Sequence, residues 1–300
     1  MKKKFIVSIL TLSMVLSMGS TTFADEATEP AVEAQQEVKP VGYLTNCYDP
    51  NGPIIIEGAM DIETSYMINA LKNPTASYVG PYYCVSGTYK GFHVVVLRTE
   101  QEAANAGAAT ALAIEQFHPC AVINQGTSGG HDPALHNYDI VIGKTTEAVD
   151  AWMSTPSAEG EGVDYKAIEM LGVYSYDPVS GTFTQKASYP CDEALLNAAR
   201  KVKGTYKDGK VVEGVISTGD EWNTQIDRML YLHELTGSSC EEMESNAVAQ
   251  ICTNYGIPFI AIRILSNAAI HNEFFAPEAG DACQKYVLNV AEEYMKQRGK

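Results

Sequence analysis

The stretch EMESNAVAQICTNYGIPFIAIRILSN, residues 242–267, decides the fold class that the sequence predicts. Apolar side chains recur at helical spacing over 242–255, and PFIAIRIL (258–265) follows as a strand. An amphipathic helix over roughly 278–297 comes next. Helices alternating with strands indicate an α/β fold, in which ligands bind beyond the carboxyl ends of the strands. Three polar residues at the end of this strand are therefore candidates for a functional site: Arg263, Ser266 and Asn267.

The same alternation extends over most of the chain on the N-terminal side. The other expected strands are 54–56, 92–99, 121–125, 139–144 and 214–218. The other expected helices are 61–72, 103–117, 191–202 and 223–235. GTSGG (126–130) predicts a glycine turn, and residues 146–190, rich in Ser, Gly, Pro and Tyr, predict a long loop insertion. We therefore expect a three-layer α/β/α fold with a central mixed, mostly parallel sheet.

The N-terminus has the pattern of a secretory signal peptide. A basic start precedes the apolar run FIVSILTLSMVLSM (5–18) and a small-residue exit that ends at Ala24. We expect cleavage after Ala24, which predicts a secreted or extracytoplasmic protein without membrane contact afterwards. A retained single-span anchor is the alternative, although the run is short for a span and no basic flank follows it. The expected parts are a signal peptide (1–24), a flexible acidic leader (25–50) and one domain over 51–300.

The composition excludes several classes of function. With 45% hydrophobic and 19% charged residues, the chain of 300 residues can bury a full core and is not expected to be disordered. Its net charge of −16 argues against nucleic acid or an anionic membrane as a partner. We interpret His131, Asp132 and His136 as loop residues, because histidines on either side of an Asp-Pro turn do not share a helix face. No metal and no cofactor is expected.

Seven cysteines follow the signal peptide, none of them in a CxxC motif or at metal-ligand spacing. An odd number cannot pair completely within one chain. Export permits disulfides, and we prefer a Cys47–Cys84 bond because these residues flank the first expected strand. The connectivity is otherwise left open. Cys252 lies in an apolar helical pattern and is expected to be a buried free thiol.

Several segments of the chain resemble one known family. IIIEGAMDIE (54–63) resembles the first strand of the 5′-methylthioadenosine/S-adenosylhomocysteine nucleosidases, in which G-A-M is followed three residues on by a catalytic glutamate. NQGTSGG (124–130) resembles their N-T-G-S-A-G-G turn, and STGDEW (217–222) their S-G-D-aromatic segment. EEMES…NYGIPFIAIRILSN resembles V-E-M-E-A…N-x-P-F-x-x-x-R-x-I-S-D. These blocks stand in the family's order over most of residues 54–270, so the chain is identified as a member of the nucleoside phosphorylase/nucleosidase superfamily.

The resemblance implies a role for each matched residue. Glu63 would be the general base that activates water, and Arg263 would contact that water and the ribose. Glu244 would hold the 2′- and 3′-hydroxyls above Met243, while Trp222 would stack on the purine, with plain core packing as its alternative. Carboxylates around the ribose would stabilise the positive charge that develops as the N-glycosidic bond breaks. The other binding residues expected from the matched blocks are Thr127, Ser128, Gly129 and Ser266.

For other residues near these blocks, the sequence predicts a role less specifically. Glu57, Glu241 and Glu242 are expected to be solvated or structural. His271 would reach the 5′ side of the sugar if a helix begins there. Members of the hydrolase branch complete or buttress their pockets across a dimer interface, so the resemblance implies a homodimer, which the 146–190 insertion could block.

The sequence departs from the family at two places that affect function. Residues 99–102 are TEQE where the family has a glycine-rich segment beside the nucleophile. Two carboxylates there would repel phosphate, which favours water as the nucleophile unless Arg98 turns inward. Asn267 replaces an aspartate that donates a proton to purine N7, and an amide has no comparably acidic proton. Because an amide can accept from a protonated N7 and donate to a 6-oxo group, Asn267 suggests either 6-oxopurine nucleosides such as inosine and guanosine or a weakened catalyst.

The sequence therefore predicts a purine nucleoside N-ribosyl hydrolase whose partner is a small-molecule purine nucleoside. One alternative is a purine nucleoside phosphorylase. The other is a non-catalytic nucleoside-binding or storage protein, since plant storage proteins of this superfamily resemble nucleosidases. A storage role requires no set such as Glu63, Glu244 and Arg263, which argues against it. Release of free purine with and without phosphate discriminates among the three.

Overall fold

The computed structural model describes residues 47–177 and 180–299. The expected signal peptide and nearly all of the acidic leader lie outside these residues. The described residues belong to one compact unit, and none of their helices has the length and hydrophobicity needed to cross a membrane.

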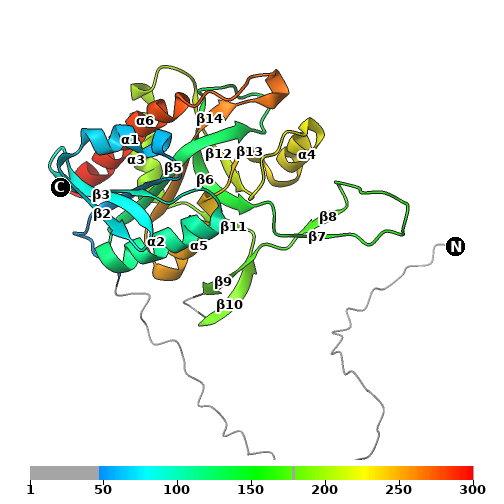
Figure 1. Ribbon diagram of the computed structural model, residues 1–300, viewed down its shortest axis with the longest axis horizontal. Coiled ribbons are helices and arrows are strands. Elements are labelled where there is room, and N and C mark those ends of the chain that lie inside the picture. Colours follow the sequence, from blue (N-terminus) through cyan, green and yellow to red (C-terminus); the bar gives the residue numbers. More distant parts are fainter. Residues whose placement is uncertain (1–46, 178–179, 300) are drawn as a thin grey trace, which may run out of the picture. The chain divides into compact units, whose positions relative to one another are not determined.

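A ten-stranded mixed sheet lies at the centre of the fold (Figure 1). Its strands are β1 (Ile54–Gly58), β2 (Lys72–Val79), β3 (Tyr82–Tyr89), β4 (Phe92–Arg98), β5 (Ala121–Gly130), β6 (Ile140–Ala148), β11 (Ser188–Pro190), β12 (Val211–Thr218), β13 (Ser238–Glu242) and β14 (Phe259–Asn267). β1 is parallel to β4 and β5, whereas β2, β3 and β4 form an antiparallel edge. β5, β13, β12, β6 and β14 pair in a closed circuit, so this half of the sheet curls into a small barrel.

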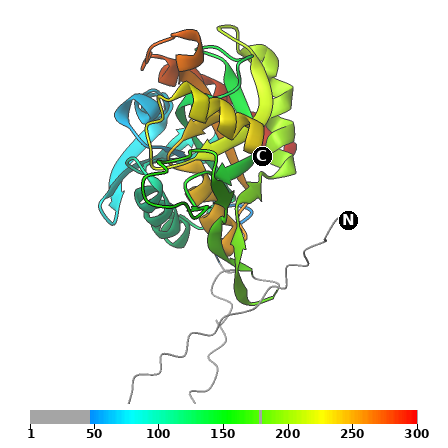
Figure 2. The same ribbon diagram turned by 90° about the vertical axis from the view of Figure 1, so that its right-hand side faces the viewer.

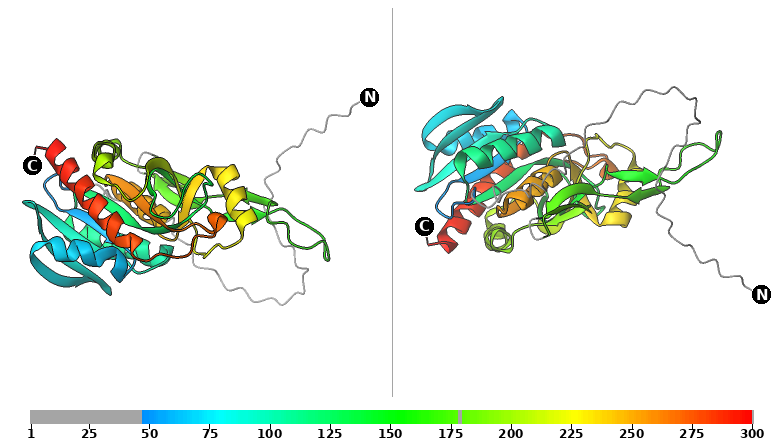
Figure 3. Two further views of the ribbon diagram at one scale, coloured as in Figure 1. Left: turned by 90° about the horizontal axis from the view of Figure 1, so that it is seen from above. Right: turned by 90° about the horizontal axis from the view of Figure 1, so that it is seen from below.

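Helices cover both faces of the sheet (Figures 1 and 3). They are α1 (Asp61–Ala70), α2 (Ala103–Phe117), α3 (Glu193–Val202), α4 (Ile226–Thr236), α5 (Ser245–Tyr255) and α6 (Ala279–Gln297), with 3-10 turns η2 (Lys203–Thr205) and η3 (Ala269–His271). α1 and α3 pack against α6, and α2 packs against α5, where a Cβ at Gly107 would lie 3.8 Å from Ile251 Cγ1. β1 is buried along its whole length, as expected for a strand between two helical layers. The predicted α/β/α fold with a mixed sheet is confirmed, and the predicted helices and most predicted strands end within a few residues of the observed bounds.

The segment 146–190, expected to be a long loop, contains regular structure. It begins inside β6 and forms two antiparallel hairpins before β11. Their strands are β7 (Trp152–Ser154), β8 (Ile168–Met170), β9 (Val173–Asp177) and β10 (Thr182–Lys186). Both hairpins project from the rest of the fold (Figures 1 and 2). Because most of their side chains are exposed, they lack the alternation of apolar and polar residues that marks a half-buried strand.

The glycine turn predicted at 126–130 is wrong, because GTSGG continues β5 to Gly130. Gly126 lies opposite Arg263 of β14, and Gly130 lies opposite Cys240 of β13. Cross-strand hydrogen bonding on both sides therefore keeps a glycine-rich segment extended. The β2–β3 hairpin and β13 were not expected from the sequence either. The exposed edge strand β2 contains a proline, and SSCEE of β13 lacks an apolar alternation.

Cys84, which lies in the described part of the chain, is a buried thiol that forms no disulfide. The preferred Cys47–Cys84 bond is therefore wrong. Cys84 Sγ and Ser77 Oγ are hydrogen-bonded at 3.1 Å, and Cys47 lies beside Glu115. Cys252 is confirmed as a buried thiol, and burial raises its pKa well above the ordinary value.

Candidate active site

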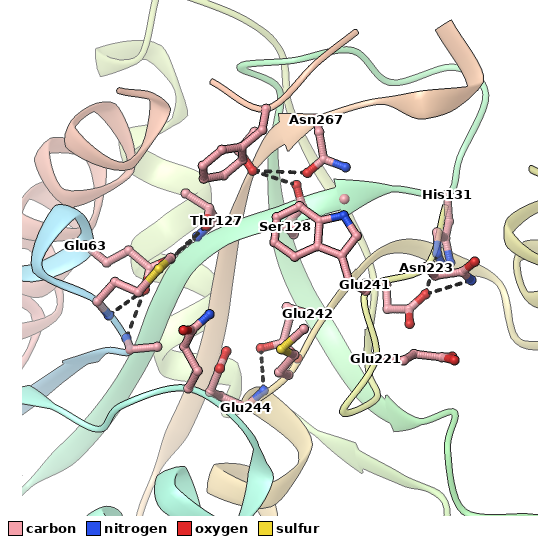
Figure 4. A pocket seen from close by; sticks show the side chains of 18 of the residues that line it. Glu63, Thr127, Ser128, His131, Glu221, Asn223, Glu241, Glu242, Glu244 and Asn267 are labelled. Carbon is pink, nitrogen blue, oxygen red and sulfur yellow. Dashed lines mark hydrogen bonds and ion pairs between the residues drawn. The ribbon is translucent and has the colours of Figure 1, made fainter. Parts of the chain in front are cut away.

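A cavity of about 200 Å³ lies at the ends of β1, β5, β13 and β14 (Figure 4). This is the edge of the sheet at which an α/β fold places its ligands. Nine of the ten predicted site residues line it: Glu63, Thr127, Ser128, Gly129, Trp222, Met243, Glu244, Ser266 and Asn267. The tenth, Arg263, lies behind the lining. The blocks matched from the sequence are thus brought to one place by the fold.

Glu63 lies in the first turn of α1, with a carboxylate held by four hydrogen bonds (Figure 4). Its Oε2 accepts from the backbone N–H groups of Ala59 at 2.9 Å and Met60 at 3.1 Å. Its Oε1 accepts from the N–H of Thr127 at 2.7 Å and from its hydroxyl at 2.9 Å. A carboxylate has about four lone-pair sites, so all are occupied. The hydroxyl of Thr127 is the donor that can rotate away and leave its place to a water molecule.

The close approach of Glu63 to β5 requires a glycine at position 126. A Cβ atom at Gly126 would lie 2.6 Å from Glu63 Oε1 and 2.9 Å from its Cδ. Such distances are far below van der Waals contact, so a side chain at this position would displace the carboxylate. Gly58 is constrained in the same way, since a Cβ there would meet the Gln125 side-chain nitrogen at 2.8 Å. The glycines of these two strands therefore position the candidate base.

Arg263 lies behind the residues that line the cavity and contacts one of them, Glu242. Its side chain is only 1% exposed, and its guanidinium bonds to Glu242 through Nε at 3.1 Å and through Nη2. Nη2 also donates to Asn124 Oδ1 at 2.6 Å. The third nitrogen, Nη1, has no hydrogen-bond partner within the described residues. A direct contact of Arg263 with ribose or water, as implied by the resemblance, is therefore limited to Nη1.

Glu242 was expected to be either solvated or structural, and its contacts give it a structural role. It accepts hydrogen bonds from the Thr218 hydroxyl, from the Ser245 N–H at 2.9 Å and from Arg263. These contacts satisfy the first turn of α5 and balance the buried arginine. The residue is buried, so the alternative of a solvated side chain is wrong.

Glu244 presents a second carboxyl group to the cavity. Its Oε1 accepts from the backbone N–H of Glu102 at 3.0 Å, and its Oε2 lies 3.4 Å from Arg263 Nη2. Burial and then the neighbouring Glu242 carboxylate raise the pKa of Glu244, while Arg263 opposes the shift. A strongly perturbed carboxyl group beside Glu63 in a cavity is typical of a catalytic centre.

The loop that departs from the family, residues 99–102, brings Gln101 to the cavity. Glu102 has a positive φ of 79°, which turns its N–H toward Glu244. Arg98 does not turn inward, because it forms an ion pair with Asp61 and lies over the ring of Tyr83. The loop therefore brings no cation that would compensate its carboxylates against a phosphate ion.

Asn267 lies away from Glu63 along the cavity (Figure 4), which Trp222 also lines. Ser266 Oγ lies 3.3 Å from Asn267 Oδ1, and accepting its proton leaves the amide NH₂ of Asn267 to face a ligand. Trp222 is 60% exposed and meets Phe275 edge-on, with ring centroids 5.8 Å apart. Core packing, the alternative considered for Trp222, is therefore wrong.

Sequence reasoning missed a polar cluster at the other end of the cavity: His131, Glu221, Asn223 and Glu241. His131, interpreted as a loop residue, is buried, with its Nε2 2.6 Å from Glu241 Oε2 and its Nδ1 3.1 Å from Ser238 Oγ. Glu241, expected to be solvated or structural, lines the cavity. Glu221 and Glu241 lie inside the matched blocks STGDEW and EEMES, but no binding role was expected for either, and His131 and Asn223 lie outside the matched blocks.

The remaining histidines lie outside the cavity lining. His136 stacks on His271 with ring centroids 4.1 Å apart and hydrogen-bonds Glu273 at 2.8 Å. A 3-10 turn does begin before His271, but its Nε2 lies 3.0 Å from the Pro133 carbonyl, so the expected place at the sugar is wrong. Over residues 47–177 and 180–299 no group of three His, Cys, Asp or Glu side chains is placed to hold a metal ion.

Glu57 is a buried carboxyl group in the middle of the sheet. It accepts from the Thr110 hydroxyl at 2.9 Å and from Asn124 Nδ2 at 3.3 Å. Burial raises the pKa of Glu57 to about 7, and these hydrogen bonds oppose the shift. Because Asn124 also holds Arg263, Glu57 belongs to the structural framework behind the cavity.

The fold and the cavity define an α/β/α domain with a carboxylate-lined site for a small molecule at its strand ends. The model of the phosphorylase superfamily matches residues 53–292, and the chain belongs to this superfamily. The 5′-methylthioadenosine/S-adenosylhomocysteine nucleosidase of Anoxybacillus flavithermus is 34% identical over 217 residues, which are 72% of this chain and 85% of that relative.

Solved structures of the same fold agree with this assignment. The nucleosidase of Neisseria meningitidis in complex with methylthio-immucillin-A has a TM-score of 0.65 and 25% identity, over 80% of this chain and 98% of that one. Futalosine hydrolase of Helicobacter pylori has a TM-score of 0.66 at 19% identity, over 81% of this chain and 98% of that one. The latter likeness concerns the fold alone.

Proposed function

We propose that this protein is a purine nucleosidase, which hydrolyses the N-glycosidic bond of a purine ribonucleoside. The observation that carries the proposal is that Glu63 and Glu244, from different ends of the chain, face one cavity that Trp222 also lines. The relatives named above are nucleosidases, which supports the same reaction class.

In the proposed reaction Glu63 takes a proton from a water molecule that replaces the Thr127 hydroxyl. The water oxygen forms a bond to C1′ as the bond from C1′ to the base nitrogen breaks, and the electron pair of that bond leaves with the base. Positive charge develops on the ribose, and the carboxylate of Glu63 stabilises it. Glu244 binds the ribose hydroxyls, and Arg263 keeps Glu244 in place.

Water is favoured over phosphate as the nucleophile because the cavity is acidic. Five glutamates line it: Glu63, Glu221, Glu241, Glu242 and Glu244. The buried Arg263 is already paired with two of them, and Arg98 is directed to Asp61. A phosphate dianion would therefore meet unbalanced negative charge.

We infer a preference for 6-oxopurines from Asn267. The NH₂ group of Asn267 suits a 6-oxo acceptor and would face another donor in adenine. The matching test measures kcat/KM for inosine, guanosine, adenosine and methylthioadenosine, with and without phosphate. Higher values for the first two, unaffected by phosphate, are expected, and Asn267→Asp should shift the preference toward 6-aminopurines.

Other outcomes of this test have defined meanings. A wild-type preference for adenine nucleosides that Asn267→Asp does not change would refute the 6-oxopurine assignment. Strict dependence on phosphate would identify a phosphorylase. Binding of nucleosides without cleavage would identify a non-catalytic binding protein.

The location and assembly of the protein are part of the proposal. The N-terminal pattern supports export with cleavage after Ala24, so the mature protein should begin at Asp25 outside the cytoplasmic membrane. Trp222, Ile226 and Leu230 are exposed apolar side chains on α4 and the loop before it, which supports a homodimer that covers them. N-terminal sequencing of exported protein and light scattering of purified protein test the two statements. An intact N-terminus on cytosolic protein, or a monomeric mass with full activity, contradicts them.

A further inference from the structure

The helix that carries Glu63, α1, has few buried residues of its own. Only three of its ten residues are buried, namely Glu63, Thr64 and Met67, and Met67 is the only apolar one among them. Helices in proteins are held mainly by the packing of an apolar face. The position of the first turn of α1 therefore depends strongly on polar contacts with its neighbours β5 and α6.

Gln125, on β5, makes the first of these contacts. Its side chain is buried, and its Nε2 donates to the backbone carbonyl of Glu63 at 2.6 Å. Its Oε1 has no hydrogen-bond partner in the described part of the chain, so the NH₂ group makes the polar contact of this side chain there. Two residues further along β5, Thr127 binds the carboxylate of the same glutamate. β5 therefore holds Glu63 by its backbone as well as by its side chain.

Gln284, on α6, holds the same turn from a second element. Its Oε1 accepts from the Met67 N–H at 3.1 Å, and its Nε2 donates to the Ile62 carbonyl at 2.8 Å. Nε2 also donates to the carbonyl of Gly280 on α6 itself at 3.2 Å. The side chain is completely buried. Because its two contacts on α1 lie on either side of Glu63 in the sequence, Gln284 fixes this turn to α6.

Both glutamines act where the backbone of α1 lies unusually close to its neighbours. A Cβ atom at Gly280 of α6 would lie 2.7 Å from the Ile62 carbonyl oxygen. A Cβ atom at Gly58 of β1 would lie 3.0 Å from the Glu63 carbonyl oxygen and 2.8 Å from Gln125 Nε2. These distances are shorter than ordinary van der Waals contacts. The turn is therefore packed closely against β1 and α6 at the points where the two amides bind it.

We propose that Gln125 and Gln284 are positioning residues of the nucleosidase reaction, because they fix the turn that presents Glu63 to water. The inference rests on the proposed function, in which Glu63 is the general base. Neither glutamine lines the cavity, so each acts through Glu63 and not on the substrate. Three of the four donors to the Glu63 carboxylate are backbone N–H groups, which meet both oxygens only while this turn stays in place. A displacement of about 1 Å at a reacting group can cost about 100-fold in rate.

The first test replaces each amide by methionine, which has nearly the same shape and no N–H donor. It measures kcat and KM of wild type, Gln125→Met and Gln284→Met with the nucleoside that wild type cleaves fastest. Gln250→Met is the matched control, because Gln250 Nε2 also donates to a backbone carbonyl at 2.6 Å, that of Tyr174, outside the cavity lining. We expect kcat to fall about 10- to 100-fold in the two variants with less than about a threefold change in KM, and the control to match wild type.

The second test separates positioning from a general effect on the fold. The same substitutions are made in a Glu63→Gln protein, in which no general base is left to position. Effects of residues that act as a unit are not additive, so Gln125→Met and Gln284→Met should change the residual kcat of this protein by less than about twofold. Urea unfolding of each variant establishes that the protein measured is folded.

Several results would overturn the inference. Wild-type kcat in both methionine variants does so. An equal fall of kcat with and without Glu63 also does so, because the glutamines would then act on the whole fold. If one methionine variant fails to fold, the other decides. A wild type that cleaves no nucleoside refutes the proposed hydrolysis and the positioning role with it, whereas an active wild type with unaffected variants refutes the positioning role alone.

Discussion

The two ends of the cavity are built in different ways. At the sugar end, backbone N–H groups of Ala59, Met60 and Thr127 hold Glu63, and that of Glu102 holds Glu244. At the base end, the end of the cavity with Asn267 and Glu241, side chains are held by other side chains. Glu241 Oε2, for example, contacts His131 Nε2 and Asn223 Nδ2. Backbone donors stay in place when the sequence varies, whereas side-chain clusters change with every substitution. The sugar end contains the matched Glu63 and Glu244 together with the loop 99–102 that departs from the family, and the base end contains the second departure, Asn267.

The largest expected effect comes from removing the base at the sugar end. Glu63→Gln keeps the shape of the side chain and loses its ability to take a proton, so hydrolysis should fall about 10²- to 10⁴-fold. Nucleoside binding should change little. Steady-state release of free purine and calorimetric binding measure the two quantities, with Glu234→Gln, an exposed residue of α4 outside the cavity lining, as control. Undiminished turnover would show that Glu63 is not the base.

A backbone substitution tests whether glycine positions that base. Gly126→Ala places a Cβ within 2.6 Å of Glu63 Oε1, so the carboxylate must move. A displacement of this kind should lower kcat about 100-fold with a smaller change in KM. Gly204→Ala is the matched control, because a Cβ there meets no atom within 4 Å. A fully active Gly126→Ala protein would contradict the proposed close packing of Glu63 against β5.

Glu57 allows a test of whether a buried carboxyl group behind the cavity titrates near neutral pH and so affects the stability of the fold. Burial raises its pKa from 4.5 to about 7, so the folded state keeps a proton that the unfolded chain releases. Wild-type stability should therefore fall between pH 4.5 and 7 and stay level above, since the native state binds more protons in that window. Glu57→Gln lacks this loss and should be more stable than wild type at pH 8 by on the order of 2 kcal/mol.

Urea unfolding at pH 5 and pH 8 measures this difference. The exposed Glu234→Gln variant should track the wild type at both pH values. An equal difference between Glu57→Gln and wild type at the two pH values would mean that Glu57 does not titrate in this window.

The smallest effect is expected at the base end. Trp222→Ala removes an aromatic face at the cavity, which should raise KM by up to about tenfold while leaving kcat nearly unchanged. Trp152→Ala, the other tryptophan of the chain, lies on the β7–β8 hairpin outside the cavity lining and serves as control. Equal KM values for the two variants would argue against stacking on Trp222.

The sequence by itself determined the fold class and most of the sugar end. Buried strands such as Ile54–Gly58 and helices such as Ala103–Phe117 follow from the spacing of apolar residues, and matched motifs identified Glu63 and Glu244. Local sequence patterns did not predict the segments whose structure depends on the strands with which they pair. GTSGG is a strand because it pairs with β14 and β13. The hairpins of 146–190 bury too few side chains to show an alternation of apolar and polar residues in the sequence.

Only the tertiary structure decided what surrounds the site residues. His131 and Glu241 are 110 residues apart and meet because β5 and β13 are neighbours in the sheet. The motif implied that Arg263 contacts water and the ribose, yet its guanidinium is paired with Glu242 and the residue does not itself line the cavity. Spacing along the chain specifies which elements form. The pairing of distant strands specifies which side chains share a cavity, because long-range contacts have no period in the sequence.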